Sequence, residues 1–392
     1  MKKSISKIMA LAFLSVGLFT TSCSSDDNTG STPSSTFVLN RDDFKGDIND
    51  GTVTLESGTY NLTGRLLVKD GAKLIIKAGV TVEASSSATD GIIRYIAVAQ
   101  GGEIQVEGTA SSPVVMTSVN KVPGSWGGLV ICGKAPINKG TPAQAEVSDL
   151  AYGGSDASDS SGSIKYLRIE YSGYAYNSEK EFNGLSMFGV GNGTTLEYIQ
   201  IHEGSDDGFE WFGGTVNAKY LVVTNFHQEV ADDLFDWTEG WSGAGENWYG
   251  IRKNASNRGI EADNNSNNHL ATPISNPTIK NLTLIGNGID GGGENHAMKL
   301  RVGTKAQFDN VVLKDWGTGF DIQHDESVGY VGTGELKATN VKFENIGTLS
   351  KGTNTAGTAV DVSGVYTENA NATGAGNGAA KPIWANGWTV GL

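Results

Sequence analysis

The sequence is poor in cysteine and proline, and both shortages narrow the kinds of protein it can encode. Its two cysteines allow at most one disulfide, and modification of Cys23 would leave Cys132 without a partner. Cys132 lies in an apolar run and is expected to be a small core side chain. Eight prolines and 38% apolar residues fit a narrow, continuous core.

Basic residues are also few. The chain has 29 Lys and Arg against 43 Asp and Glu, which gives a net charge of −14. So acidic a surface repels polyanions and argues against nucleic acid or an anionic membrane as a partner. Binding would then depend on attached lipid, divalent cations, neutral ligands or protein.

The sequence almost lacks the 3.6-residue apolar period of amphipathic helices, which argues against an α-helical solenoid. It contains 54 glycines instead, about twice the usual share. Glycine readily adopts positive φ, so these residues suit tight corners between short strands.

Six eight-residue segments share one pattern, with apolar residues at their second and fourth positions. They begin at Tyr166, Tyr198, Tyr220, Asn281, Asn310 and Asn340. This period-2 alternation is typical of a strand with one buried face. The starts are 32, 22, 61, 29 and 30 residues apart. Spacings of 22 to 32 residues suit one coil of a solenoid, and 61 suits two coils with a loop insertion. The sequence therefore predicts an all-β fold, a single right-handed parallel β-helix.

The first 22 residues predict a lipoprotein signal peptide. Lys2, Lys3 and Lys7 precede an apolar run over residues 8–19 that is too short to span a membrane. Residues 20–23 resemble the lipobox of bacterial lipoproteins, with threonine where leucine is usual. The resemblance implies lipidation of Cys23, and the alternative is a signal peptide cut elsewhere that releases a secreted protein.

The rest of the chain divides into a tether and one domain. Residues 23–36 are rich in Gly, Ser, Thr and Pro and are expected to be a disordered tether. Residues 24–27 resemble the Ser/acidic tag that sends some outer-membrane lipoproteins to the cell surface. Residues 37–392 are expected to form the β-helix, with an irregular segment at 352–380 and a terminal cap at 383–390.

A second set of short strands predicts an outward column of charged residues. Aligned in register, the column contains Glu210, Asp236, Glu261, Lys299 and Asp321, and the next one ends in Asp263, Arg301 and Gln323. Parallel strands lie about 4.7–4.9 Å apart, so successive carboxylates would repel one another. At least one carboxyl pKa would be raised unless a cation neutralises the group.

This acidic pattern predicts a Ca²⁺ site, because Ca²⁺ prefers carboxylate oxygens. The expected metal ligands are Asp206, Asp207, Glu210, Asp232, Asp233 and Asp236. The alternative is an ordinary solvated ladder, in which water and salt screen the charges.

Aromatic residues in a Gly-rich stretch at 240–250 predict contacts with sugar rings. We interpret this stretch as an insertion in which exposed rings stack on sugar faces, although rings that only cap the flank of the solenoid fit equally. Trp237 alternates inward and is expected in the core. The predicted ligand-binding set is Trp241, Trp248, Tyr249, Glu261, Asp263 and His296.

Two enzyme classes with this fold can be compared by residue type. Polygalacturonase-like hydrolases carry Gly-His-Gly and Arg-Ile-Lys motifs beside their aspartates, and the chain has neither. Polysaccharide lyases pair a Lys or Arg base with Ca²⁺, and Lys299 and Arg301 resemble that pair. Salt bridges of Lys299 with Glu261 and of Arg301 with Asp263 would explain the pattern equally well.

Three runs also resemble a group of surface β-helix lipoproteins that accompany TonB-dependent outer-membrane transporters. They are residues 124–138, 206–214 and 296–303, and the similarity extends from about residue 40 to 350. The resemblance implies an outer-membrane lipoprotein that faces the cell exterior and leaves its chemistry open. The export tag, the aromatic insertion and the lack of a complete catalytic motif favour a binding protein that captures a glycan or other nutrient. A Ca²⁺-dependent polysaccharide lyase acting on an acidic glycan, or a structural or adhesive protein, remain the alternatives.

Overall fold

The computed structural model describes residues 35–392, except 87–89, 178–179, 227–230 and 254–256. The expected signal peptide, Cys23 and nearly all of the expected tether lie outside the described residues. Residues Pro33–Leu392 form one compact unit. No helix among the described residues is long and apolar enough to cross a membrane.

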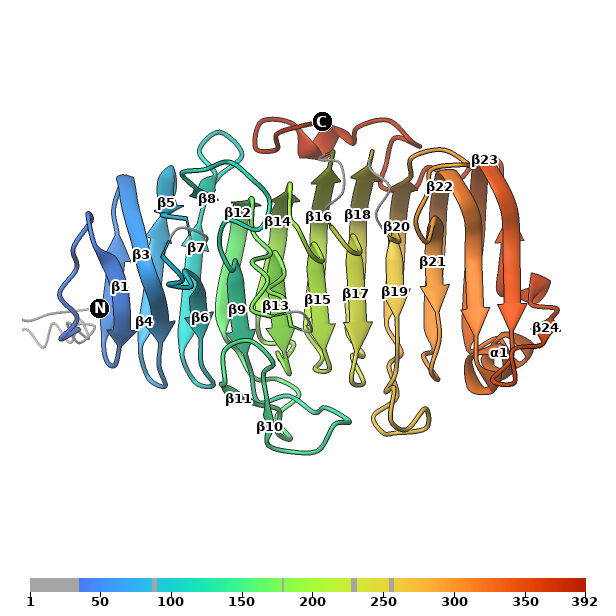
Figure 1. Ribbon diagram of the computed structural model, residues 1–392, viewed down its shortest axis with the longest axis horizontal. Helices are drawn as coiled ribbons and strands as arrows, with labels where there is room; N and C mark the ends of the chain where they lie inside the picture. The colour runs from blue at the N-terminus through green and yellow to red at the C-terminus, as the bar shows by residue number, and fades with distance from the viewer. Residues whose placement is uncertain (1–34, 87–89, 178–179, 227–230, 254–256) are drawn as a thin grey trace, which may run out of the picture. The chain divides into compact units, whose positions relative to one another are not determined.

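The unit is a parallel β-helix, which confirms the predicted all-β architecture. Strands of successive coils lie side by side from the blue to the red end of the chain (Figure 1). They pair in parallel with the equivalent strands one coil away and form three ladders, named A, B and C here. Ladder A carries the candidate site.

Ladder A contains β1 (Phe44–Ile48), the end of β3 (Gly58–Val68), β6 (Ile96–Val98), β9 (Leu129–Cys132), β13 (Leu185–Phe188), β15 (Phe209–Phe212), β17 (Phe235–Thr238), β19 (Ile260–Ala262), β21 (His296–Leu300) and the ends of β22 (Ala306–Gln323) and β23 (Leu336–Thr353). Ladder B contains β2 (Thr52–Leu55), β4 (Lys73–Lys77) and β7 (Glu103–Glu107), followed by the first parts of β12 (Gly162–Glu170), β14 (Thr195–His202), β16 (Asn217–Asn225), β18 (Ala244–Arg252), β20 (Thr278–Ile285), β22 and β23. Ladder C contains the start of β3, β5 (Val80–Ala84), β8 (Val114–Ser118), the later parts of β12, β14, β16, β18 and β20, and the middle parts of β22 and β23.

The remaining elements lie outside the three ladders or at the C-terminal end. They are the antiparallel pair β10 (Ala143–Gln144) and β11 (Ala151–Tyr152), the helix α1 (Asp325–Thr333), β24 (Ala359–Val360), β25 (Tyr366–Glu368) and the 3₁₀ turns η2 (Ser363–Val365) and η3 (Ile383–Ala385).

The first residue of each predicted eight-residue segment forms the corner between ladders B and C. All six adopt positive φ, between 52° and 58°. Asparagine tolerates this left-handed conformation better than most residues. The asparagines also bond from coil to coil: Asn310 donates to Asn281 Oδ1 at 2.8 Å. The tyrosines stack instead, with ring centroids 4.3 Å apart for both Tyr166–Tyr198 and Tyr198–Tyr220.

The 61-residue gap between Tyr220 and Asn281 contains one further coil, as the spacing predicted. Its corner is Asn247, with φ of 61°, and Asn281 donates to Asn247 Oδ1 at 3.1 Å. The residues that follow, Trp248 to Arg252, therefore continue strand β18 and do not form a loop insertion.

An insertion after β9 covers part of the outer face of ladder A. Cys132, Phe188 and Phe212 point outward in register, and the rings of Phe188 and Phe212 stack at 4.1 Å. Ile137 and Tyr152 of the insertion pack over them. Cys132 is thereby fully buried, as expected, and burial raises the pKa of its thiol.

The C-terminal segment runs back along the flank of the solenoid and does not cap its end (Figure 1). Trp388 packs edge-on against the rings of Tyr166 and Tyr198, each at 6.0 Å. Gln200 bonds Val390 in both directions, at 2.7 and 2.9 Å. The stretch at 352–380 is not wholly irregular, since β24, η2 and β25 fall within it.

Candidate functional site

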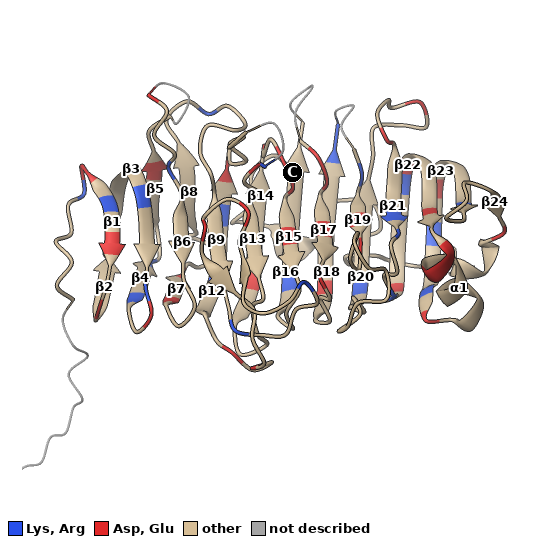
Figure 2. Cartoon of the chain, turned by 60° about the horizontal axis from the view of Figure 1, so that its bottom comes forward, with Lys and Arg blue, Asp and Glu red and all other residues tan. Residues whose placement is uncertain are grey.

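Three columns of polar side chains run along ladder A, each placed by the parallel register. The floor column is Ser186, Glu210, Asp236, Glu261, Lys299, Asp321 and Lys351. This alignment confirms the predicted outward column, which appears as acidic bands on β15, β17 and β19 in Figure 2. The second predicted column contains Asp263, Arg301 and Gln323, each two residues after a member of the floor column.

The members of a third column lie two residues before the strands, except the last, His296, which is the first residue of β21. Each member lies three residues before a floor residue, at the turn into ladder A. This edge column contains Asn183, Asp207, Asp233, Arg258 and His296. The backbone joins its members: Gly184 N–H donates to the Asp207 carbonyl, Gly208 N–H to Asp233 and Leu234 N–H to Arg258. The same spacing of three residues in the sequence could have identified Asn183 and Arg258, which our sequence analysis missed.

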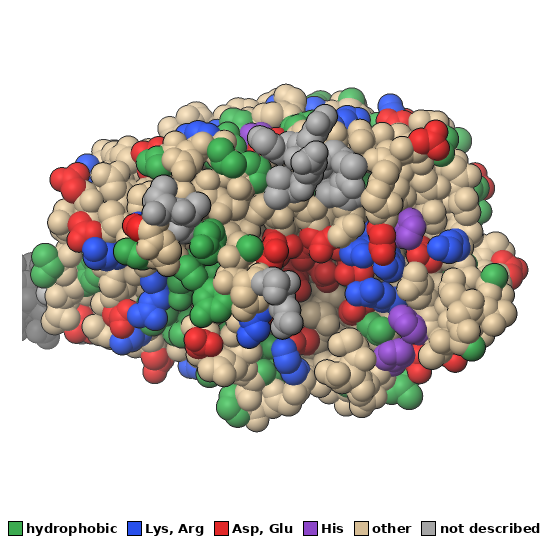
Figure 3. All heavy atoms as spheres, viewed as in Figure 1, with side chains coloured by type: hydrophobic (Ala, Val, Ile, Leu, Met, Phe, Trp, Pro, Cys, Tyr) green, Lys and Arg blue, Asp and Glu red, His purple; other side chains and the backbone are tan. Residues whose placement is uncertain are grey.

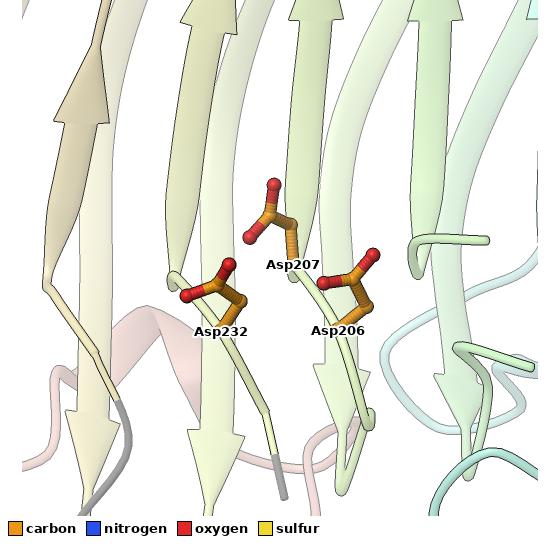
Figure 4. Close-up of side chains that lie close together, drawn as sticks. All are labelled: Asp206, Asp207 and Asp232. Atoms are coloured by element: carbon orange, nitrogen blue, oxygen red, sulfur yellow. The ribbon is translucent and has the colours of Figure 1, made fainter. Parts of the chain in front are cut away.

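Edge and floor acids, together with Asp206 and Asp232, which each precede an edge residue by one, form what we call the carboxylate groove. It consists of Asp206, Asp207, Glu210, Asp232, Asp233, Asp236 and Glu261. Three sets of three carboxylates have oxygens within 4.8 Å of one another: Asp206, Asp207 and Asp232; Asp207, Glu210 and Asp236; and Asp233, Asp236 and Glu261. Figure 4 shows the first set, with Asp206, Asp207 and Asp232 gathered at the strand ends. The register thus brings the six predicted metal ligands together.

The carboxyl groups of the groove keep their protons to higher pH than free carboxyl groups do. Burial raises the pKa of Asp207 well above its ordinary value, and the negative charges of Asp206 and Asp236 raise it further. Burial and the charge of Glu210 do the same to Asp236. The pKa of Glu210 is raised first by burial and next by the negative charge of Glu146, which belongs to the insertion after β9. The predicted repulsion is therefore present and strong.

Among the described residues, the ion pairs of the groove acids lie toward its far end, apart from a longer one between Arg258 Nη1 and Asp232 at 3.8 Å. Arg258 Nη1 lies 3.0 Å from Asp233 and 3.1 Å from Glu261, and its Nη2 lies 2.7 Å from Glu294. Burial nevertheless raises the pKa of Asp233 to about 8, helped by Asp232 and opposed by Arg258. In Figure 3 basic side chains border the acidic ones on the side toward β21.

Lys299 and Arg301 are both engaged in ion pairs. Arg301 contacts Asp263 at 2.8 Å, as predicted, and also Glu261 at 3.0 Å. Lys299 pairs with Glu294 at 2.6 Å and not with Glu261, which corrects the second predicted salt bridge. The lysine stands in register beside Glu261, but Glu294 reaches it from the loop before β21.

His296 lies at the far end of the edge column, beside Asp321. Its Nδ1 is 3.3 Å from Asp321 Oδ2 without a hydrogen bond between them, and Asp321 Oδ2 accepts a hydrogen bond from Gln323 at 2.8 Å. Asp321 is completely buried. Burial lowers the pKa of His296, and the charge of Asp321 opposes that shift.

The prediction that Trp241, Trp248 and Tyr249 stack on sugars is wrong. Both tryptophans are fully buried in the β-helix core, where their indole N–H groups bond to the carbonyls of Val216 and Ala218. Tyr249 is 3% exposed and donates its hydroxyl to Ala379 of the C-terminal segment. Trp237 is buried in the core, as expected.

An open cleft of about 570 Å³ adjoins the groove at its N-terminal end. It is lined by Pro123, Gly124, Tyr174, Ala175, Glu181, Ser205, Asp206, Ala231 and Asp232. Burial raises the pKa of Glu181, and the charge of Asp232 adds to this effect. The lining of the cleft therefore combines acidic residues with apolar ones and a tyrosine.

Ca²⁺ is expected to stabilise the protein by binding in the carboxylate groove. Millimolar Ca²⁺ added after EDTA treatment should raise the melting temperature progressively, because the ion relieves repulsion in the folded state only. Changing Asp207 and Asp236 together to Asn should abolish the shift, since each belongs to two of the three sets. The exposed pair Asp42 and Asp290, changed likewise, serves as the matched control. An equal shift in the groove variant would mean that these acids are ordinary surface charge.

Comparison with known proteins gives one match. A family described as a pectate-lyase like beta helix domain matches residues 46–389. No curated protein and no solved structure matches the chain.

Proposed function

Since the chain belongs to the family of pectate-lyase like beta helix domains, we propose that it binds a glycan along the carboxylate groove. The observation that carries the proposal is the alignment of the floor and edge columns along ladder A. Together they present in-register polar side chains over successive coils, from Ser186 to Asp321. Such a row suits an extended chain that repeats its contacts along the axis.

A Ca²⁺-dependent lyase acting on an acidic glycan is the second candidate. It is favoured by Arg301 and Lys299, which follow the carboxylates by one coil, as a catalytic base beside a metal ion would. Against it, the Lys299 side chain is 8% exposed and paired with Glu294, while Arg301 is held by two carboxylates. A base must be free to accept a proton from substrate, so binding without cleavage fits the ion pairs better.

A glycan array with the purified protein, followed by calorimetry on each hit, tests the proposal. We expect binding that is lost when Asp207 and Asp236 become Asn and kept when Asp42 and Asp290 do. Acidic polysaccharides with Ca²⁺ should give no ultraviolet absorbance from an unsaturated product. Absorbance that appears with the wild type and disappears in Lys299→Ala or Arg301→Ala would establish the lyase instead. If no glycan binds and none is cleaved, a structural or adhesive role is favoured.

We further propose that the protein is anchored to the outer membrane by lipid on Cys23, faces the cell exterior and supplies a TonB-dependent transporter. The lipobox-like residues 20–23 and the acidic tag that follows support this location. Palmitate label should appear in the wild type and be absent from Cys23→Ala. Protease added to intact cells should degrade the wild-type protein, and resistance to it would contradict surface exposure.

A further inference from the structure

The N-terminal half of the carboxylate groove presents hydrogen-bond acceptors with very few donors. Among the described residues, no donor contacts the side-chain carboxylates of Asp206 or Glu181. Asp207 accepts one hydrogen bond, from the Asp233 N–H at 2.8 Å. Lys299 and Arg301 are engaged further along the stack. Arg258 lies closest to Asp233 and Glu261, and its Nη1 is 3.8 Å from Asp232, which also accepts a hydrogen bond from Asn257. Among the described residues Asp206 and Glu181 therefore have no ion-pair partner, and this half of the groove is only weakly neutralised.

Asn183 adds an independent sign that a donor is missing there. It belongs to the edge column, one coil before Asp207, and its side chain is 2% exposed. Its Nδ2 donates to Glu210 Oε2 at 2.5 Å, which places the amide in the groove. Its Oδ1 is buried and accepts no hydrogen bond. Buried acceptors are nearly always satisfied in folded proteins, so this amide oxygen points to a ligand that donates.

The cleft beside these acids is large enough to hold an organic group that also carries a charge. Its volume is about 570 Å³, of the size of many small-ligand sites. Pro123, Ala175 and Ala231 contribute apolar atoms to its lining, and the partly exposed Tyr174 lines it as well. An aromatic face packs on a sugar ring and also attracts a positive charge.

We propose that the glycan bound by this groove is cationic, an oligosaccharide of amino sugars with free ammonium groups. The ammonium groups pair with Asp206 and Asp232 while a sugar ring packs on Tyr174. Each ammonium offers three donors and a positive charge to a surface that has acceptors and negative charge. An acidic glycan would bring further repulsion and would need metal ions between the two sets of carboxylates. The inference depends on the proposed glycan binding and specifies the ligand.

Calorimetry with three oligosaccharides of equal length tests this inference. They are a β-1,4-linked glucosamine hexasaccharide, its fully N-acetylated form and a galacturonate hexasaccharide, measured near neutral pH, because acid would protonate the groove carboxyls. The glucosamine hexasaccharide should bind at least tenfold more tightly than the acetylated one, and added NaCl should weaken it. Added Ca²⁺ should compete with it for the carboxylates, whereas Ca²⁺ would strengthen binding of the galacturonate. Changing Asp206 and Asp232 together to Asn should reduce the affinity about tenfold or more, and changing Asp42 and Asp290 should leave it unchanged.

Several results would overturn the inference. Equal affinity for the acetylated and free amino sugars would show that charge plays no part. Tighter binding of the galacturonate in Ca²⁺ would assign the groove to acidic glycans and leave glycan binding intact. Equal losses in the groove variant and the control variant would place the ligand elsewhere. If none of the three hexasaccharides binds and the glycan array is also blank, the proposed function itself fails. Circular dichroism of each variant confirms that it is folded.

Discussion

Trp248→Ala is expected to lower the free energy of unfolding by about 3–5 kcal/mol, the range measured for removing large aromatic side chains from cores. Trp248 is fully buried. Its ring stacks between those of Trp211, at 5.0 Å, and Phe235, at 4.8 Å. Alanine would leave a cavity between two coils and remove the indole N–H that donates to the Ala218 carbonyl at 3.1 Å. Urea unfolding followed by circular dichroism measures the loss.

Two comparisons make this result specific. Trp248→Phe keeps an aromatic ring in the stack and should cost much less than alanine. Tyr176→Ala removes a side chain that is 49% exposed and should change stability by no more than about 0.5 kcal/mol. A Trp248→Ala protein with unchanged stability and lost glycan binding would contradict the buried position and restore the role in sugar stacking that the sequence suggested.

The second large effect is an inverse dependence of stability on pH. Without divalent ions, the protein should lose several kcal/mol of stability as the pH rises from about 5 to about 8, because each unit of raised pKa corresponds to about 1.4 kcal/mol. The folded pKa values of Asp206, Asp207, Glu210 and Asp236 lie well above their ordinary values of 3.8 and 4.5. Folded carboxyls therefore retain protons that the unfolded chain has already released.

The sign follows from that difference in bound protons. Below the unfolded pKa both states are protonated and the groove contributes no penalty. Between the unfolded and folded pKa values the folded state binds more protons, so each rise in pH favours unfolding. The penalty is complete above the folded pKa, which for Asp233 is about 8.

Thermal melts in EDTA across this pH range measure the effect. Asp236→Asn should flatten the curve and raise the melting temperature at the alkaline end, because it removes one of the repelling charges. Asp43→Asn is the control: Lys45 lowers the pKa of that exposed carboxyl, so its removal should not flatten the curve. Ca²⁺ should also flatten the wild-type curve. A wild type that grows more stable from acid to neutral pH would show that the groove is well solvated.

Two patterns in the sequence, the alternation of apolar residues and the spacing of the repeats, explain why so much of the fold could be predicted. Alternating apolar residues specify which face of each strand is buried, and a slip of one residue would expose that whole face. The repeat spacing then gives the coil, and from β12 to β23 Tyr or Asn marks the corner between ladders B and C. Once the strands are aligned, the floor column from Glu210 to Asp321 follows with no further information.

The tertiary structure was needed to show that the aromatic residues at 240–250 are buried. Gly-rich flanks made residues 240–250 look like a loop, yet Asn247 occupies a corner and Trp248 fills the core. The sequence carried this signal, because Asn247 begins a segment with the same corner as its neighbours. It was obscured because glycines flank the segment on both sides and bulky aromatics replace the usual aliphatic residues.

The composition of the groove was decided partly by the sequence and partly by packing. The period of the strands was enough to predict that Glu210, Asp236 and Glu261 align. When the apolar residues of adjacent coils are in register, the residues between them are in register as well. Only the tertiary structure placed Glu146 near enough to raise the pKa of Glu210, and Glu181 near Asp232. It also decided that Lys299 pairs with Glu294 and not with Glu261, and that an insertion covers the apolar outer face beside the groove. Those residues come from loops, and a loop is positioned by the surfaces it packs against and not by any period in its own residues.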